Sequence, residues 1–390
     1  MERIYLDNAA TTACAPEVVE AMLPYFTQTY GNASSIHAFG REAKRALEVA
    51  RREVARALNA AAPQEILFTA GGSESDNWAI KGAAFARQDK GRHIITTAIE
   101  HHAVLHTCQW LEQQGFEVTY LPVDGDGKVS VAAVEKAMRP DTILVSVMAA
   151  NNEIGTLQPV GEIGHLCREK GVLFHTDAVQ AVGAIPMDVQ AMSIDLLSLS
   201  AHTFHGPKGI GALYVRKGVW LDNLIHGGAQ ERGFRAGTEN LPGAVGLGKA
   251  ISMATAQLEE NAARMSRLRD KLIAGVMARV PDVHLNGHPV DRLPNNCTLS
   301  FKYVEGEALL LRLDLAGVAG SSGSACTSGT LDPSHVLLAI GLPHAMAHGS
   351  LRLTLGADTT DADIDAVLER LPPIVADLRA MSAMNAFNMT

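Results

Sequence analysis

The chain has 390 residues, of which 47% are hydrophobic and 19% charged, and its formal net charge is −9. This composition is typical of a globular protein, and the length exceeds what one hydrophobic core usually supports, so we expect two domains. The acidic balance disfavours nucleic acid as a partner. We expect neither a membrane span nor a signal peptide, because no apolar run of the required length occurs. The 5 cysteines lack a metal-binding spacing and favour a cytoplasmic, thiol-reduced protein.

Short apolar segments alternate with helix-length amphipathic segments through most of the chain. The expected strands are Glu65–Thr69, His93–Thr97, Glu117–Pro122, Ile143–Met148, Val172–His175, Leu196–Ser200 and Gly211–Val215. Expected helices between them are Ser73–Arg87, Ala103–Gln114 and Ile163–Lys170. Strands rich in Ile, Val and Leu that alternate with helices are typical of an α/β protein with a mostly parallel sheet.

The pattern changes near residue 257. The later segments predict a helix, a strand, a helix, a strand and a closing helix, at Leu258–Arg279, Thr298–Tyr303, Glu305–Leu315, Leu351–Leu355 and from about Thr360. We therefore expect a large domain over residues 16–257 and a smaller α/β domain over 258–390. Residues 1–15 are assigned to the smaller domain, although their pattern suits either. A run of small residues around Cys326 predicts a mobile loop that carries one thiol.

Polar groups follow several of the expected strands. Gly72 and Ser73 open a helix, and a helix N-terminus offers N–H groups to an anion such as phosphate. His101, Asn152 and Asp177 follow three further strands. Each has an ordinary structural explanation when taken singly, such as a helix cap or a satisfied core histidine. Together they would meet at one edge of the sheet and suit an anionic, aromatic cofactor with a cationic ring nitrogen.

We expect no metal site. His101 and His102 are adjacent and therefore point in different directions, and His335, His344 and His348 lack a reliable ligand spacing. Four cysteines have structural explanations, as core or turn residues: Cys14, Cys108, Cys167 and Cys297.

Seven segments carry a resemblance to a known family: Tyr5–Thr12, Gly31–Ser35, Glu100–His101, Asn151–Thr156, His175–Gln180, Arg235–Asn240 and Ser322–Cys326. In this order they resemble the cysteine desulfurases, pyridoxal-phosphate (PLP) enzymes of the aminotransferase class V group. The similarity is closest to the nitrogen-fixation and iron–sulfur branch. The resemblance implies a PLP-dependent fold type I homodimer that takes sulfur from L-cysteine, leaves L-alanine and passes a persulfide to an iron–sulfur scaffold protein.

The resemblance also implies residue roles. His101 would stack on the PLP ring and shuttle protons, while Asp177 would keep the ring nitrogen protonated. Arg352 would bind the substrate carboxylate, and Cys326 would attack the substrate sulfur. The remaining implied contacts are Asn152 to cofactor and substrate, Gln180 to the ring hydroxyl, Gly72, Ser73, Ser200 and His202 to the phosphate, and Thr238 from the partner subunit.

One position departs from the family. The family has Ser-Ala-His-Lys-Phe-His-Gly-Pro-Lys-Gly where this chain has Thr203 in place of the first lysine. That lysine forms the Schiff base with PLP and moves the substrate Cα proton, and Thr203 can do neither. Lys208 is no obvious substitute, because the family carries a lysine there as well. We therefore expect PLP to bind weakly, or as a preformed aldimine with an amino acid, and turnover to be slight or absent.

Several interpretations stay open on the sequence. Three explanations of Thr203 stay open: a substitution made in a working desulfurase, a natural alteration, or a sequence error. Cys326 argues against an aminotransferase, which needs no nucleophilic thiol, whereas a selenocysteine lyase fits the same motifs. A non-catalytic PLP-binding or scaffold protein of a sulfur pathway is favoured by Thr203 and disfavoured by the retained His101, Asp177 and Arg352.

Overall fold

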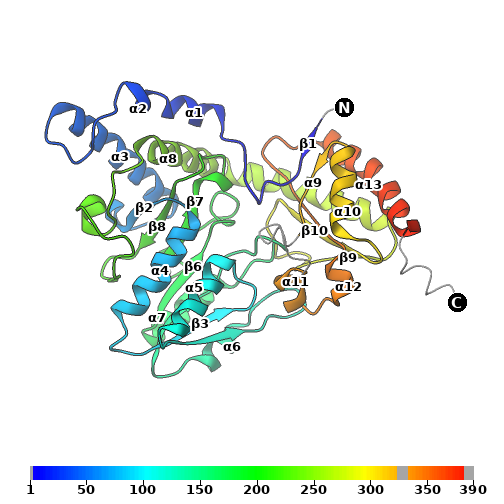
Figure 1. The fold of residues 1–390 in the computed structure, drawn as a ribbon, viewed down its shortest axis with the longest axis horizontal. Coiled ribbons are helices and arrows are strands. Elements are labelled where there is room, and N and C mark those ends of the chain that lie inside the picture. Colours follow the sequence, from blue (N-terminus) through cyan, green and yellow to red (C-terminus); the bar gives the residue numbers. More distant parts are fainter. Residues whose placement is uncertain (1–2, 323–332, 382–390) are drawn as a thin grey trace.

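The structure is a computed structural model that describes residues 3–322 and 333–381. Figure 1 shows a large sheet with helices around it on one side of the molecule and a smaller sheet with its own helices on the other. The first and the last described elements, β1 (Ile4–Tyr5) and α13 (Asp361–Met381), both lie in the smaller part.

The large sheet has seven strands: β2 (Ile66–Thr69), β3 (His93–Thr97), β4 (Glu117–Leu121), β5 (Thr142–Ser146), β6 (Leu173–Asp177), β7 (Leu196–Ser200) and β8 (Gly211–Val215). Their order is β2-β8-β7-β6-β5-β3-β4. Only β8 runs antiparallel to its neighbours among these strands. The mostly parallel α/β sheet expected from the sequence is therefore confirmed.

Three strand ends differ from the expectation, of which β4 ends at Leu121, one residue before the expected Pro122. β6 extends to Asp177, so this carboxylate belongs to the strand and does not follow it. β5 ends at Ser146, two residues before the expected end, although the Val147 and Ala149 N–H groups still donate to the His175 and Asp177 oxygens of β6.

Both faces of the large sheet are covered, as the continuous apolar runs predict. Alternate residues of β2 show this, because Ile66 and Phe68 join one hydrophobic cluster and Leu67 joins another. The first cluster includes residues of α3 (Ala38–Ala57), α6 (Val131–Ala137), α7 (Val160–Lys170) and α8 (Leu241–Ala256). The second includes residues of α4 (Gly72–Ala86) and α5 (His102–Gln113). Two short helices, α1 (Pro16–Met22) and α2 (Pro24–Thr27), precede α3.

The smaller sheet is antiparallel, in the order β12-β10-β9, and consists of β9 (Val283–Leu285), β10 (Asn296–Phe301) and β12 (Ser350–Thr354). Its core includes residues of α9 (Leu258–Arg279), α10 (Gly306–Leu315) and α13 (Asp361–Met381). Short helices α11 (His335–Ala339) and α12 (His344–Ala347) lead into β12. Strand β1 (Ile4–Tyr5) pairs in parallel with β11 (Val318–Ala319), so the N-terminal residues lie with this part. The domain boundaries stay a prediction.

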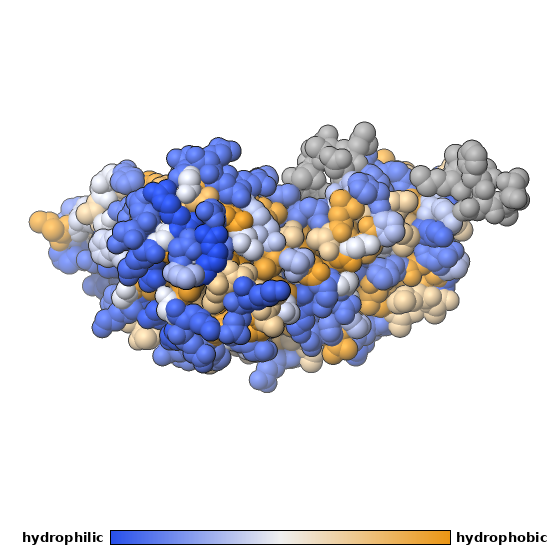
Figure 2. Space-filling model, turned by 90° about the horizontal axis from the view of Figure 1, so that it is seen from below, coloured by the Kyte–Doolittle hydropathy of each residue, from blue (hydrophilic) through white to orange (hydrophobic). Residues whose placement is uncertain are grey.

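Within the described ranges no helix combines the length and the hydrophobicity needed to cross a membrane. On the face drawn in Figure 2, hydrophobic residues form small areas separated by hydrophilic ones.

A buried ion pair joins α3 to the edge of the large sheet. Arg51 is 2% exposed, and its two terminal nitrogens each donate to the Glu231 carboxylate at 2.7 Å. Glu231 also accepts from the backbone N–H of Phe68 on β2, at 3.1 Å. Glu231 and Arg232 have φ angles of 46° and 61°, in the left-handed region. The ion pair therefore holds a strained turn against the sheet.

Arg51→Met is expected to lower the free energy of unfolding by about 3–5 kcal/mol, because Glu231 would be left buried without a cation. The matched control is Arg56→Met on the same helix, where the arginine side chain is 74% exposed and pairs with Glu53. Such a helical surface pair contributes about 0.2–0.5 kcal/mol. Urea unfolding of both variants measures the difference, and equal losses would contradict the assignment.

Candidate active site

A cavity of about 280 Å³ lies at the carboxyl ends of the parallel strands. The sequence predicted nine of its lining residues: Gly72, Ser73, His101, Asn152, Asp177, Gln180, Ser200, His202 and Arg352. They come from the ends of β2, β3, β5, β6 and β7 and from β12 of the smaller sheet. The meeting of strand ends at one sheet edge is what brings side chains so distant in sequence together.

One end of the cavity is formed by the start of α4. A Cβ atom on Gly72 would lie 2.6 Å from Cγ2 of Val179, so glycine lets the helix start approach the segment after β6. Ser73 follows in the first turn, where the free backbone N–H groups of a helix start can bind an anion. His202 lies nearby on the lining, and burial, with a further contribution from Lys208, lowers its pKa. This end therefore offers helix N–H groups and an imidazole.

The floor of the cavity holds three titratable groups. Asp76, His101 and Asp177 each place one ligand atom within 4.8 Å of the others. Asp177 accepts a hydrogen bond from the Val179 N–H at 2.9 Å. Burial raises the pKa of both carboxyls, and for Asp76 the charge of Asp177 adds to this rise. A cationic group placed here would relieve the repulsion between the two carboxyls.

The sequence analysis missed Asp76. It lies on α4, four positions after Gly72, and is 1% exposed. The i, i+4 spacing places both residues on one helix face, which was the available signal. Nothing in the sequence shows that this face turns toward Asp177.

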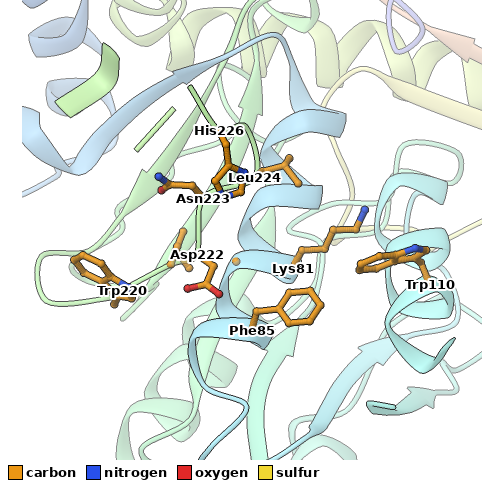
Figure 3. Close-up of a pocket in the computed structure, with 10 residues that line it drawn as sticks. Lys81, Phe85, Trp110, Trp220, Asp222, Asn223, Leu224 and His226 are labelled. Atoms are coloured by element: carbon orange, nitrogen blue, oxygen red, sulfur yellow. The ribbon is translucent and has the colours of Figure 1, made fainter. Parts of the chain in front are cut away.

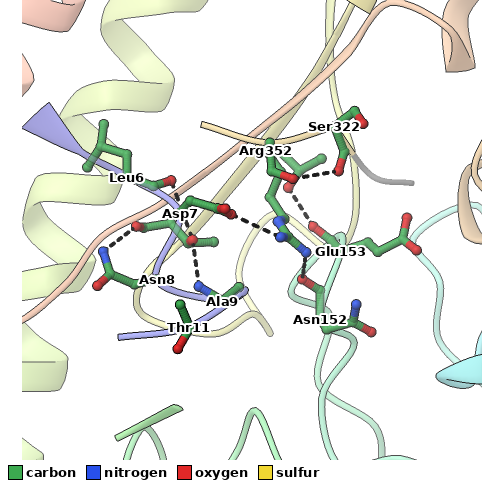
Figure 4. A network of polar contacts seen from close by, with 12 residues as sticks. Leu6, Asp7, Asn8, Ala9, Thr11, Asn152, Glu153, Ser322 and Arg352 are labelled. Carbon is green, nitrogen blue, oxygen red and sulfur yellow. Dashed lines mark hydrogen bonds and ion pairs between the residues drawn. The ribbon is translucent and has the colours of Figure 1, made fainter. Parts of the chain in front are cut away.

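Arg352 connects three segments at the rim of the cavity, as Figure 4 shows. One terminal nitrogen donates to the backbone oxygen of Asn152 at 3.0 Å, and the other to Oδ1 of Asp7 at 3.1 Å. The Nε atom is buried without a hydrogen-bond partner among the described residues. A fixed guanidinium with an unused N–H suits an anionic ligand. Asp7, which lies in a motif noted in the sequence, was not predicted to be its partner.

Thr203 does not line this cavity. Its hydroxyl contacts the backbone oxygens of Val179 and Ser200, at 2.9 and 3.0 Å. Lys208 is exposed and is also absent from the lining within the described chain. The local turn therefore presents no amine to the cavity.

One further predicted residue lies elsewhere. Thr238 lines a separate cavity with Phe68 and Arg235, so it is not part of the same chain's strand-end cavity. Cys326 lies outside the described residues. Cys108 and Cys167 are buried free thiols, as predicted for core residues, Cys297 is buried within β10, whereas it was expected to precede that strand, and Cys14 is partly buried.

A larger cavity, of about 580 Å³, is drawn in Figure 3. It lies between α4, α5 and residues 220–226, and none of the predicted site residues lines it. Its main feature is aromatic, with Nζ of Lys81 4.5 Å from the centre of the Trp110 ring and Trp220 68% exposed. The strand-end cavity, with its buried titratable groups, is the stronger candidate active site.

Two more buried carboxyls lie behind the cavity. Glu100 accepts from the Thr97 hydroxyl at 2.7 Å and from the Met148 N–H at 3.0 Å, yet burial raises its pKa to about 8. Glu153 accepts from the Ser334 hydroxyl, and burial raises its pKa to about 7. Glu100 immediately precedes the lining residue His101, and Glu153 immediately follows the lining residue Asn152. Both carboxyls therefore contribute to the charge around the cavity.

Residues 4–367 match the family model of the class V aminotransferases. A cysteine desulfurase IscS from Methanosarcina thermophila is 60% identical over 381 residues, which cover 98% of this chain and 94% of the relative. A second one, from Clostridium botulinum, is 59% identical over 386 residues, which cover 98% of this chain and 97% of the relative. The chain belongs to the cysteine desulfurase family. The resemblance found in the sequence is confirmed.

Solved structures support the same conclusion for this desulfurase family member. A NifS-like protein has a TM-score of 0.90 and 41% identity, covering 96% of this chain and 100% of its own. A structure described as SspA in complex with cysteine has a TM-score of 0.81 and 40% identity. The match covers 90% of this chain and 98% of that structure's chain. The fold is therefore PLP-dependent fold type I, and the family cofactor is PLP, as expected.

One specific observation indicates that the cavity fits PLP. Three lining side chains have a buried polar atom without a hydrogen-bond partner among the described residues: Asp76 Oδ1, His202 Nδ1 and Arg352 Nε. Buried polar atoms are normally satisfied, so these atoms indicate a polar ligand. PLP carries a phosphate and a ring nitrogen that can be protonated, and the helix start and the two carboxyls are complementary to these groups.

Glu153→Gln is expected to flatten the pH dependence of stability between about pH 5 and 7. The folded-state pKa is about 7 against the ordinary 4.5, so the folded chain retains a proton that the unfolded chain loses. Stability therefore falls as the pH rises through this window, by up to about 1.4 kcal/mol per pH unit. Thermal unfolding at a series of pH values measures the effect. The exposed Glu169→Gln serves as control, and parallel curves for the two variants would contradict the assignment.

Proposed function

We propose that this chain's site carries out desulfuration of L-cysteine, with L-alanine and a persulfide on Cys326 as products. In the balanced reaction, the Cys326 sulfur bonds to the substrate sulfur while the substrate C–S bond breaks. The electron pair of that bond stays on carbon, which then takes a proton. The observation that supports this proposal is the meeting of Asp177, His101 and Arg352 at one cavity.

The lining residues would hold the cofactor from several sides. PLP supplies an electron sink when it is bound. Asp177 would keep a proton on the ring nitrogen, and His101 would lie against the ring and move protons. The other proposed contacts are Gly72, Ser73, Ser200 and His202 for the phosphate, Gln180 for the ring hydroxyl and Asn152 for cofactor and substrate. Gln180 is already oriented by a 2.9 Å hydrogen bond from its side-chain nitrogen to the Ala9 oxygen.

Arg352 would bind the carboxylate of the amino-acid substrate. Its ion pair with Asp7 fixes the guanidinium, and its Nε is left to a ligand. A planar guanidinium binds a carboxylate through two N–H groups, which gives orientation as well as affinity. This places the substrate carboxylate at the rim contributed by β12.

We propose further that Thr203 impairs turnover. The hydroxyl lies against two backbone oxygens, and a threonine offers no amine to replace the lysine that the family has at this position. Loss of a positioned general base usually costs about 10²–10⁴ in rate. The same observation favours a second candidate, a non-catalytic PLP-binding or sulfur-pathway scaffold protein. Selenocysteine lyase activity is a further alternative for the same residues.

Thr203→Lys is expected to raise alanine release from L-cysteine by at least about 10²-fold, because it supplies the missing base. Thr203→Met is the matched control, with a side chain of similar length and no amine. Alanine is measured with added PLP and a reductant.

Two outcomes would contradict these proposals. Release by the unaltered chain at about 1 s⁻¹ or more, a rate ordinary for enzymes, would show that Thr203 does not impair it. Failure of both the unaltered and the Thr203→Lys chain would remove desulfuration and favour the non-catalytic candidate.

We also propose a homodimer. Large apolar side chains are exposed on the connection from α2 to α3 and on the start of α3, with Tyr30 65%, Ile36 91% and Phe39 53% exposed. Hydrophobic atoms protrude at this end of the molecule in Figure 2. Thr238 lies outside its own chain's strand-end cavity, which is compatible with a contribution to the partner's site. Burying this exposed apolar surface against a second copy of the chain would be energetically favourable.

Ile36→Asp is expected to shift the protein toward a monomer, because a charge would have to be buried in the interface. Val290→Asp is the control, since Val290 is 75% exposed in the other part of the molecule. Sedimentation velocity measures the mass of both variants. An unchanged dimer with Ile36→Asp, or a monomer before any substitution, would contradict the proposed interface.

We propose an iron–sulfur scaffold protein as the sulfur acceptor and the cytoplasm as the location. Support for the acceptor comes from the resemblance to the iron–sulfur branch and from the IscS relatives.

A further inference from the structure

Three histidine rings lie together just outside the cofactor cavity. The His102 ring centre is 4.9 Å from that of His106 and 4.8 Å from that of His335. His102 and His106 are one turn apart on α5, and His335 begins α11. No metal site was expected at His102, because it is adjacent to His101, or at His335, because it lacks a ligand spacing; the contact between the two is not visible in the sequence.

The nitrogen atoms of this histidine cluster are available for a ligand. Nε2 of His335 is 3.0 Å from the backbone oxygen of Glu100, which can only accept, so the proton is on Nε2 and Nδ1 keeps its lone pair. Nδ1 of His102 is buried without a hydrogen-bond partner among the described residues. His106 is exposed.

Burial shifts two of the three imidazoles toward the neutral form. Burial lowers the pKa of His102 to about 4, and repulsion from His335, His106 and His101 adds to the effect. Burial also lowers the pKa of His335, against the hydrogen bond to Glu100. Neutral imidazoles are the form that binds metal ions.

We propose that His102, His106 and His335 bind one divalent first-row transition metal ion, such as Zn²⁺ or Co²⁺. Two histidines at i, i+4 on a helix are a familiar metal-binding pair, and a carbonyl that orients the third imidazole is the usual outer partner. The rings are now stacked, at 28° for His102 and His106, so binding requires a side-chain rotation. The exposed His106 is free of packing that would prevent it. Three imidazoles leave a coordination position open.

The histidine cluster is separate from the carboxylate-rich group of Asp76, His101 and Asp177, which lines the cofactor cavity. PLP would occupy that cavity and exclude a metal ion from it. A metal ion in the histidine cluster would instead link α5 to the beginning of α11, the helix that follows residues 323–332. The consequence is a cross-link between the two parts of the fold beside the cavity.

The test is equilibrium dialysis of the full chain, with PLP added, against Zn²⁺. We expect one ion per chain, and at least a tenfold weaker binding in His106→Ala and in His335→Ala. His284→Ala, at an exposed histidine of β9, is the matched control and is expected to bind as the unaltered chain does. Zn²⁺ is also expected to raise the melting temperature of the unaltered and His284→Ala chains but not of the other two.

Each alternative outcome identifies another site and overturns the proposal. Binding lost on addition of PLP, or in Asp76→Asn, would place the ion in the cofactor cavity. Binding lost in Cys326→Ser, with a thiolate absorption band in the Co²⁺ form, would assign it to that thiol. No stoichiometric binding, or equal affinity in His106→Ala and the control, would exclude the histidine cluster. His106 is exposed, so its replacement leaves folding intact.

Discussion

The geometry of the site depends on how Arg352 is held. Its side chain joins Asp7 near the N-terminus to the Asn152 backbone after β5, and its own backbone exchanges hydrogen bonds with Ser321. Four segments of the chain thus meet at one residue, Arg352, which is 3% exposed. Asp7 and Arg352 both belong to the smaller part, and the bond to the Asn152 oxygen joins them to the large one, so the two sheets cannot separate here without leaving a buried N–H of the cation unpaired.

The charge around the cavity is unbalanced toward acid. Asp76, Glu100, Glu153 and Asp177 are all buried, and all four have a raised pKa because of burial. Among the described residues that line the cavity, Arg352 is the only arginine or lysine. Such an arrangement lowers stability, so it is explained best by a ligand that brings positive charge and protons into the site. The cationic ring nitrogen of PLP satisfies this requirement.

Much of the fold followed from local patterns, and the site only in part. The strands could be predicted because they are continuous apolar runs, and His101 and Asp177 because each lies at a strand end. Asp76 and Asp7 could not, because a helix face and an N-terminal segment have no sequence signal for what they pack against. The contact between His102 and His335 likewise depends on how α11 folds back on α5. Tertiary packing decides such contacts, and a single sequence shows only which residues are available.

The turn after β7 has an evolutionary consequence. The Thr203 hydroxyl is satisfied by the backbone oxygens of Ser200 in the same turn and of Val179 in the segment after β6, so this turn keeps its shape without a bound ligand. Threonine and lysine codons of the form ACA and AAA, or ACG and AAG, differ by a single base. Under the proposed role of position 203, a gene that uses either of these threonine codons stands one base change from a chain with the family's lysine.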